Sequence, residues 1–145
     1  MKKVSKEIAQ AFIFNKKRKL GNTYTKQAES YTYNGVLQNL GGLFLHDNKI
    51  AWWDDAQHWD NEECTILSNN IHLCFSMCGW GTQTTRERLN TLFALLFKNY
   101  RLQQRYDLVQ LSQKNYKQIL HVNDVDFEID DDAIFTLRKV NNCPV

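Results

Sequence analysis

The residues best suited to bind a ligand lie between positions 80 and 88, where an expected strand meets an expected helix. They supply an indole, a hydroxyl and guanidinium groups at Trp80, Thr85, Arg86 and Arg88. With the free backbone N–H groups of a helix start, such groups suit a phosphate or a stacked base. The structural alternative is that Trp80 packs beneath the helix, Thr84 caps it, and the arginines face solvent or acidic partners. Both interpretations stay open.

A run of basic residues near the N-terminus forms a second candidate site. Its members are consecutive in the sequence, at Lys16, Lys17, Arg18 and Lys19. We expect a helix over about residues 6–19, capped by Ser5, so that the run falls in its last turn. There it either contacts phosphates or forms a solvated helix end that complements the helix dipole.

Three residues that could ligate zinc share one face of an expected strand, at His72, Cys74 and Cys78. Cys64 is the obvious fourth ligand. However, Asn69-Asn70 predicts a hairpin turn whose register places Cys64 opposite Phe75, on the apolar face. The chain also has no CxxC pair. We therefore expect inert thiols, no metal site and no cofactor.

Residues for acid–base or nucleophilic catalysis are sparse. The four histidines are scattered, and no nucleophile elbow, P-loop or dinucleotide motif occurs. The acids between residues 54 and 63 lack the regular spacing of a calcium loop. We expect that the protein is not an enzyme.

The element that must position the residues of the first site is a strand followed by a helix. Residues 71–77 alternate between apolar and polar side chains, as in a strand with two distinct faces. Thr84 and Glu87 match a capping box. Beyond them an apolar stripe with helical spacing is formed by Leu89, Leu92, Phe93, Leu96 and Phe97. We expect this helix to pack on the strand.

Turn signals between strand-like segments predict several hairpins. These signals are Asn34-Gly35, Asp47-Asn48, Asn69-Asn70 and Asn123-Asp124. After the last of them, residues 125–129 predict a strand with one wet face, and residues 134–140 fit either a strand or a short helix. The patterns together predict a single-domain α+β fold. An antiparallel sheet built from hairpins packs against a central helix (about 84–98), with an N-terminal helix over about 6–19.

Length and composition are those of one folded domain covering residues 1–145, with 43% hydrophobic and 23% charged residues. No segment is apolar enough to span a membrane, and no signal peptide is evident. Four cysteines without a secretory signal indicate reduced thiols inside a cell. The net charge of +2 hides an uneven distribution, because residues 1–20 carry seven basic side chains and residues 123–132 carry six acids.

Two blocks of sequence resemble a group of small bacteriophage accessory proteins. The first is the hairpin segment 43–51, similar to L-H-G-N-x-I-A, and the second is the segment 79–90, similar to G-W-x-T-x-T-T-x-E-R-L-N. This chain departs from that pattern in an acidic, Trp-rich insertion at about 52–64, a longer segment at about 26–41, and Asp47 where glycine is usual. The resemblance implies a viral protein in the cytoplasm of a bacterial host cell. It implies no particular activity.

Two functions of different classes follow from these observations. The first is nucleic-acid binding through the basic run and the start of the central helix. The alternative is a protein-binding, anti-CRISPR-like inhibitor of a host nucleoprotein complex. It would use a segment over 52–63, expected to be irregular or helical, and the acidic stretch 124–132. Its contact residues in 52–63 would be Trp52, Trp53, Asp54, Asp55, Trp59, Asp60, Glu62 and Glu63.

Overall fold

The computed structural model describes residues 3–14, 16–26, 32–33, 36–37, 41–55, 71–96 and 108–137. It has an α+β fold in which antiparallel strands predominate, as predicted. The two helices are α1 (Lys3–Ile13) and α2 (Gln83–Leu95). Neither combines the length and apolar character that crossing a bilayer requires, and no other helix occurs among the described residues.

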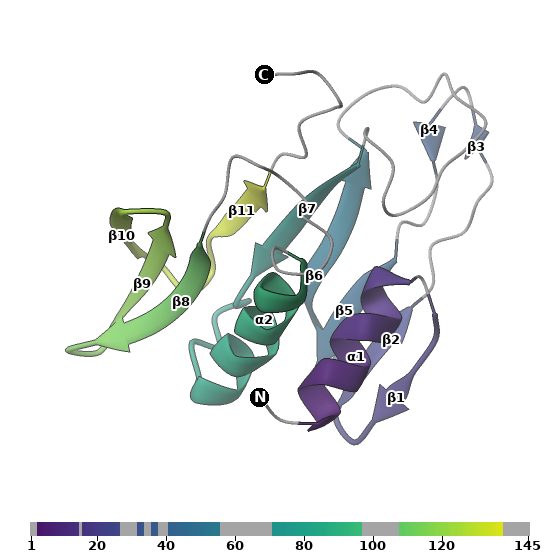
Figure 1. The fold of residues 1–145 in the computed structure, drawn as a ribbon, viewed down its shortest axis with the longest axis horizontal. Coiled ribbons are helices and arrows are strands. Elements are labelled where there is room, and N and C mark those ends of the chain that lie inside the picture. Colours follow the sequence, from purple (N-terminus) through teal and green to yellow (C-terminus); the bar gives the residue numbers. More distant parts are fainter. Residues whose placement is uncertain are drawn as a thin grey trace.

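The larger sheet has six strands in the order β1-β2-β5-β6-β7-β11. Its strands are β1 (Lys19–Leu20), β2 (Thr23–Lys26), β5 (Gly42–Leu45), β6 (Asn48–Asp55), β7 (Ile71–Ser76) and β11 (Ile134–Leu137). Both helices lie against the same face of this sheet, side by side (Figure 1). The C-terminal strand β11 therefore completes a sheet that begins near the N-terminus.

A three-stranded sheet lies on the far side of α2, in the order β10-β9-β8 (Figure 1). Its strands are β8 (Val109–Lys114), β9 (Lys117–Val122) and β10 (Val125–Ile129). A third, two-stranded ladder joins β3 (Thr32–Tyr33) and β4 (Val36–Leu37). The pairings Tyr33–Val36 and Val122–Val125 confirm the hairpins predicted around Asn34-Gly35 and Asn123-Asp124.

The hydrophobic core lies between the helices and the six-stranded sheet and extends to the inner residues of β8 and β9. Each helix contributes an apolar stripe, Ile8 and Phe12 from α1 and Leu89, Leu92, Phe93 and Leu96 from α2. The Phe93 ring meets the Phe75 ring edge-on, with 4.8 Å between centroids. The predicted packing of the helix on the strand is confirmed, because the stripe from Leu89 to Leu96 is fully buried.

The N-terminal helix differs from its predicted range of about 6–19. It begins at Lys3, so Ser5 is inside the helix and is not its cap, and it ends at Ile13. The basic run is not helical, because Arg18 pairs with Thr25 in a sheet-like manner. The Arg18 N–H donates to Thr25 Oγ1, and the Thr25 N–H donates to the Arg18 carbonyl, each at 2.9 Å.

The predicted capping box at Thr84 and Glu87 is wrong. The cap of α2 is Thr82, whose side chain accepts a hydrogen bond from the Thr85 N–H at 3.2 Å. Glu87 instead binds Ser5 and Arg88, so its carboxylate does not fold back onto the helix start. The helix therefore starts at Gln83, and residues 97 and 98 of its predicted range lie outside the described residues.

One predicted hairpin is corrected, and another is described only in part. The turn between β5 and β6 is His46-Asp47, with φ of 49° and 64°, and not Asp47-Asn48. Leu45 pairs with Asn48, so the two turn residues lie one position earlier than predicted. The His46 N–H also donates a hydrogen bond to the Asn22 carbonyl at 2.9 Å. The structure pairs β7 with β6 on one side and with β11 on the other, two partners that the sequence did not predict. Residues 65–70, the rest of the hairpin predicted around Asn69-Asn70, lie outside the described residues.

Three further segments add to or alter the predicted strands. Trp52 to Asp55 continue β6 in register with β7, where the sequence suggests an irregular or helical segment. The segment 134–140 contains a strand, β11. In β10, Val125 and Phe127 are 51% and 48% exposed, so the predicted apolar face is not covered. The reason is that α2 packs against β8, two strands away.

Candidate nucleic-acid interface

The basic run forms an exposed segment between α1 and β2. All four side chains, at Lys16, Lys17, Arg18 and Lys19, are exposed. Within the described residues only Arg18 of these four forms an ion pair, with Glu7 at 3.0 Å. Three ammonium groups therefore remain available to an anionic ligand.

Arg88 lies inside the molecule, in a polar network between α1, α2 and β2. Its guanidinium binds Glu87 Oε2 at 2.6 Å and Thr23 Oγ1 at 3.2 Å, and it also donates to Ser5 Oγ. The Ser5 hydroxyl donates to the Glu87 carboxylate. Only 11% of the Arg88 side chain is exposed, so the contacts of this predicted site residue are within the protein.

Arg86 is also held by contacts within the protein. Its Nη1 atom donates to the Gly81 carbonyl at 2.7 Å and to Gln118 Oε1 at 3.1 Å. Burial lowers the pKa of the Arg86 guanidinium below its ordinary value. A Cβ atom at Gly81 would lie 2.5 Å from Gln118 Nε2, so a larger residue there would displace the Gln118 side chain, which contacts Arg86.

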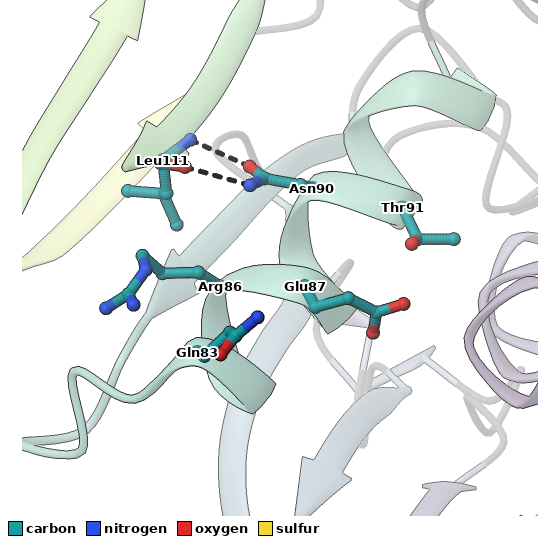
Figure 2. Close-up of a pocket in the computed structure, with 6 residues that line it drawn as sticks. All are labelled: Gln83, Arg86, Glu87, Asn90, Thr91 and Leu111. Carbon is teal, nitrogen blue, oxygen red and sulfur yellow. Dashed lines mark hydrogen bonds between the residues drawn. The ribbon is translucent and has the colours of Figure 1, made fainter. Parts of the chain in front are cut away.

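A pocket of about 370 Å³ lies beside these residues, between α2 and β8. Figure 2 shows its six lining residues, Gln83, Arg86, Glu87, Asn90, Thr91 and Leu111. Asn90 forms two hydrogen bonds with the backbone of Leu111, which are drawn as dashed lines. The Asn90 side chain therefore connects α2 to β8.

A second pocket, of about 450 Å³, lies at the start of α2. Its rim includes Trp80, Thr82 and Thr84 on one side and His46 and Asn48 from the β5–β6 hairpin on the other. Trp80 is 61% exposed and does not pack beneath the helix. Thr85, by contrast, is 1% exposed, and its hydroxyl is 3.0 Å from Thr82 Oγ1. Of the residues predicted here, Trp80 alone presents a largely free surface.

The residues of the protein-binding alternative are described only in part. Trp52 is half-buried in β6, and Trp53, Asp54 and Asp55 follow it in the same strand. The remaining predicted contact residues, Trp59, Asp60, Glu62 and Glu63, lie outside the described residues.

The two described thiols contact protein groups. Cys74 Sγ lies 3.4 Å from Thr136 Oγ1, and Cys78 Sγ donates to the Lys49 carbonyl at 3.0 Å. Burial raises the pKa of the Cys78 thiol, against the opposing effect of a hydrogen bond from Ser76. Within the part of the chain that the structure describes, no three His, Cys, Asp or Glu residues form a cluster for a metal.

Sequence reasoning missed a line of three polar side chains across the three-stranded sheet. His121 Nε2 is 2.6 Å from Ser112 Oγ, and His121 Nδ1 is 2.6 Å from Asp126 Oδ1. Serine hydrolases use the same order of bonds, but beside an oxyanion hole. Here the Asp126 side chain is 66% exposed. Ser112 is next to Leu111 in β8, so its side chain points to the opposite face from Leu111 and away from the pocket of Figure 2. We interpret these bonds as structural, because they connect β8, β9 and β10.

Sequence reasoning also missed the aromatic and basic side chains on the six-stranded sheet. The rings of Tyr24 and Phe44 are stacked, with centroids 4.9 Å apart and planes 2° from parallel. Lys26 Nζ lies over the Phe44 ring at 4.8 Å, and Lys49 Nζ over the Trp52 ring at 5.5 Å. The strand register brings these residues together, and no local sequence pattern reveals it.

Comparison with known proteins places the chain in a family. A family model for the Kyanoviridae Gp96 protein matches residues 1–136, which is most of the chain. Comparisons with curated proteins and with solved structures find no match. On the evidence of the family match, the protein belongs to the Kyanoviridae Gp96 family, a family of bacteriophage proteins.

Proposed function

We propose that this phage protein is an accessory factor that binds nucleic acid in the cytoplasm of the infected bacterium. The observation that carries the proposal is the exposure of the basic segment, residues 16–19. None of its three lysines has an acidic partner among the described residues. Exposed ammonium groups replace the counterions of a phosphate backbone, which is the main source of affinity for nucleic acid.

The start of α2 supports this proposal with fewer residues than the sequence suggests. Trp80 is exposed beside a pocket at the helix start and can stack on a base. Arg86 and Arg88 act as positioning residues, because their guanidinium groups hold Gly81, Gln118, Glu87 and Thr23 in place. The proposed contacts are therefore the lysines of the basic segment and the indole of Trp80.

A charge-matched pair of variants tests the proposal. Lys16→Ala with Lys17→Ala removes two charges from the basic segment, and Lys114→Ala with Lys117→Ala removes two from the β8–β9 turn. Affinity for fluorescent oligonucleotides is measured by anisotropy between about 50 and 200 mM salt. We expect the first variant to bind more weakly and to reduce the salt slope by about 0.7–0.9 for each lost phosphate contact. The second variant should bind as the wild type does.

Two results would contradict the proposal. One is the absence of binding to single- or double-stranded oligonucleotides at the lowest salt. The other is an equal loss of affinity in both variants, which would mean that the basic segment has no special part in binding.

A second candidate function, inhibition of a host nucleoprotein complex, is favoured by β10. This strand lies at the edge of the three-stranded sheet and exposes Val125 and Phe127 between Asp124, Asp126 and Glu128. An exposed apolar edge with acidic neighbours suits a basic protein surface. In an assay of target cleavage by a purified RNA-guided host complex, Val125→Ser with Phe127→Ser should abolish inhibition. If the wild type does not inhibit cleavage, this candidate fails.

A further inference from the structure

The outer face of the six-stranded sheet, turned away from α1 and α2, has an unusual set of side chains. The strand register aligns Lys19, Tyr24, Phe44 and Lys49 as one row across β1, β2, β5 and β6. The next row contains Lys26, Gly42 and Trp52. Their neighbours along the strands, Thr23, Thr25, Leu43 and Ala51, are buried, as expected for the opposite face toward the helices.

The aromatic residues on this outer face are held in a fixed arrangement. Phe44 stacks on Tyr24, and a Cβ atom at Gly42 would lie 2.8 Å from Phe44 Cε1. The Phe44 ring therefore leans over Gly42, which leaves no space for a larger residue. Trp52, in the adjacent strand β6, is the cross-strand partner of Gly42. All three aromatic residues are half-buried, so part of each ring is accessible.

The charge of this outer face is positive. Lys19, Lys26 and Lys49 are all exposed, and each lies within one strand of an aromatic residue. Asp47, in the β5–β6 turn beside this face, accepts a hydrogen bond from the Tyr24 hydroxyl. Lys19 also belongs to the basic segment, so the positive surface continues from that segment onto the sheet.

We propose that this outer sheet face binds single-stranded nucleic acid, with unpaired bases against Tyr24, Phe44 and Trp52 and phosphates near Lys19, Lys26 and Lys49. Base stacking on aromatic side chains beside a positive surface is a general means of holding a single strand. A duplex offers the same phosphates, but its bases are already paired and stacked. The inference rests on the proposed function and adds which form of nucleic acid is bound.

The wild-type protein gives the first test. A 12-nucleotide oligomer containing 4-thiouridine is bound at low salt and cross-linked by long-wave ultraviolet light, and the cross-linked residues are mapped by mass spectrometry. We expect cross-links at Tyr24, Phe44 or Trp52. Cross-links confined to residues 16–18 and Trp80 would overturn the inference and leave the proposed function intact.

Variants give the second test. Phe44→Leu and Trp52→Leu keep an apolar side chain but remove the ring. Lys26→Ala with Lys49→Ala keeps the rings but removes two positive charges and their contacts with Phe44 and Trp52. Stacking on one aromatic residue contributes about 1–3 kcal/mol, which corresponds to a loss of about 5- to 160-fold in single-strand affinity for each ring variant. Duplex affinity should change less than about 2-fold. The lysine variant should weaken both, and Lys114→Ala with Lys117→Ala is its control.

The remaining outcomes separate the two proposals. Equal losses of single-strand and duplex affinity in the ring variants would overturn the inference. So would binding of polyglutamate as tightly as the oligonucleotide, because that would identify an acidic peptide as the ligand. If no nucleic acid binds at any salt concentration, the inference and the proposed function both fail. Circular dichroism shows whether each variant has kept its fold.

Discussion

Arg88 illustrates how a single charged residue can serve the fold rather than a ligand. Its guanidinium joins Ser5, Thr23 and Glu87, which come from one strand and both helices. Ser5 and Thr23 are almost completely buried. Without the guanidinium, a carboxylate and two buried hydroxyls would lose a partner, which costs more than the bonds themselves contribute.

We therefore expect Arg88→Met to lower the free energy of unfolding by about 3 kcal/mol, as measured by urea denaturation. The matched control is Arg18→Met, which breaks the exposed pair with Glu7 and should cost less than about 1 kcal/mol. Equal costs at the two sites would contradict the structural role of Arg88.

Tyr24 has a raised pKa that is open to measurement. Burial raises it most, followed by the hydrogen bond to Asp47 and the negative charge of that carboxylate. A pKa that is higher in the folded state means that the neutral phenol stabilises the fold. This contribution is complete below the unfolded-state pKa of about 10 and is lost as the pH rises through the folded-state pKa.

Asp47→Asn should lower the pKa of Tyr24 in the folded protein, although the effect of burial remains. Asparagine also tolerates the φ of 64° at this position. The measurement is a pH titration of ¹³C-labelled tyrosine rings by NMR, with Asp124→Asn as the control at a distant turn. An unchanged Tyr24 titration in Asp47→Asn would show that the carboxylate does not act on the phenol.

At the scale of elements, the start of α2 shows what a local pattern can and cannot predict. The apolar stripe from Leu89 to Leu96 predicts the helix and its buried face correctly, because periodicity records burial. The predicted cap is wrong by two residues, because Glu87 stands three residues after Thr84 and completes a capping-box pattern, whereas the observed cap is Thr82. The partners that Glu87 has instead, Ser5 and Arg88, become visible only in the fold.

The position of the cap is directly testable. Thr82→Ala should destabilise the protein by about 1 kcal/mol, because the Thr85 N–H loses its acceptor. Thr84→Ala is the matched control and should cost much less, since Thr84 does not cap the helix. Thermal unfolding of both variants measures the difference, and a larger cost at Thr84 would restore the predicted capping box.

The hairpins show the same difference: a turn can be predicted from neighbouring residues, but the pairing of distant strands cannot. Asn123-Asp124 is a correct prediction because the turn and the two strands that it joins are contiguous in the sequence. The turn Asn115-Tyr116, with φ of 52° and 65°, carries a tyrosine where glycine is usual and was missed. No local pattern predicts that β11, from the other end of the chain, pairs with β7. The outer-face row from Lys19 to Lys49 was missed for the same reason.

At the scale of the whole molecule, Asn90 connects the two sheets. Its Nδ2 atom donates to the Leu111 carbonyl at 2.9 Å, and its Oδ1 atom accepts from the Leu111 N–H at 2.7 Å (Figure 2). Since β8 is an edge strand of the three-stranded sheet, these two bonds replace part of a missing neighbouring strand. The helix therefore closes the edge of one sheet while packing on the other.

Asn90→Leu should destabilise the protein by about 1–3 kcal/mol, because the buried Leu111 backbone loses both partners. Hydrogen exchange should increase more in β8 and β9 than in β6 and β7. Gln110→Leu, at an exposed position of the same strand, is the control. Uniformly faster exchange in both sheets would mean that they unfold as one unit.

The network around Ser5 also constrains how the protein is made. Ser5 and Glu87 are 82 residues apart in the chain. At about 5–20 residues per second, a ribosome takes roughly 4–16 s to synthesise the interval between them. During that time α1 is present in the nascent chain without its polar partners. A product that stops before residue 87 would therefore contain a first helix whose apolar side can pack on β2 and β5 but whose Ser5 lacks both Glu87 and Arg88.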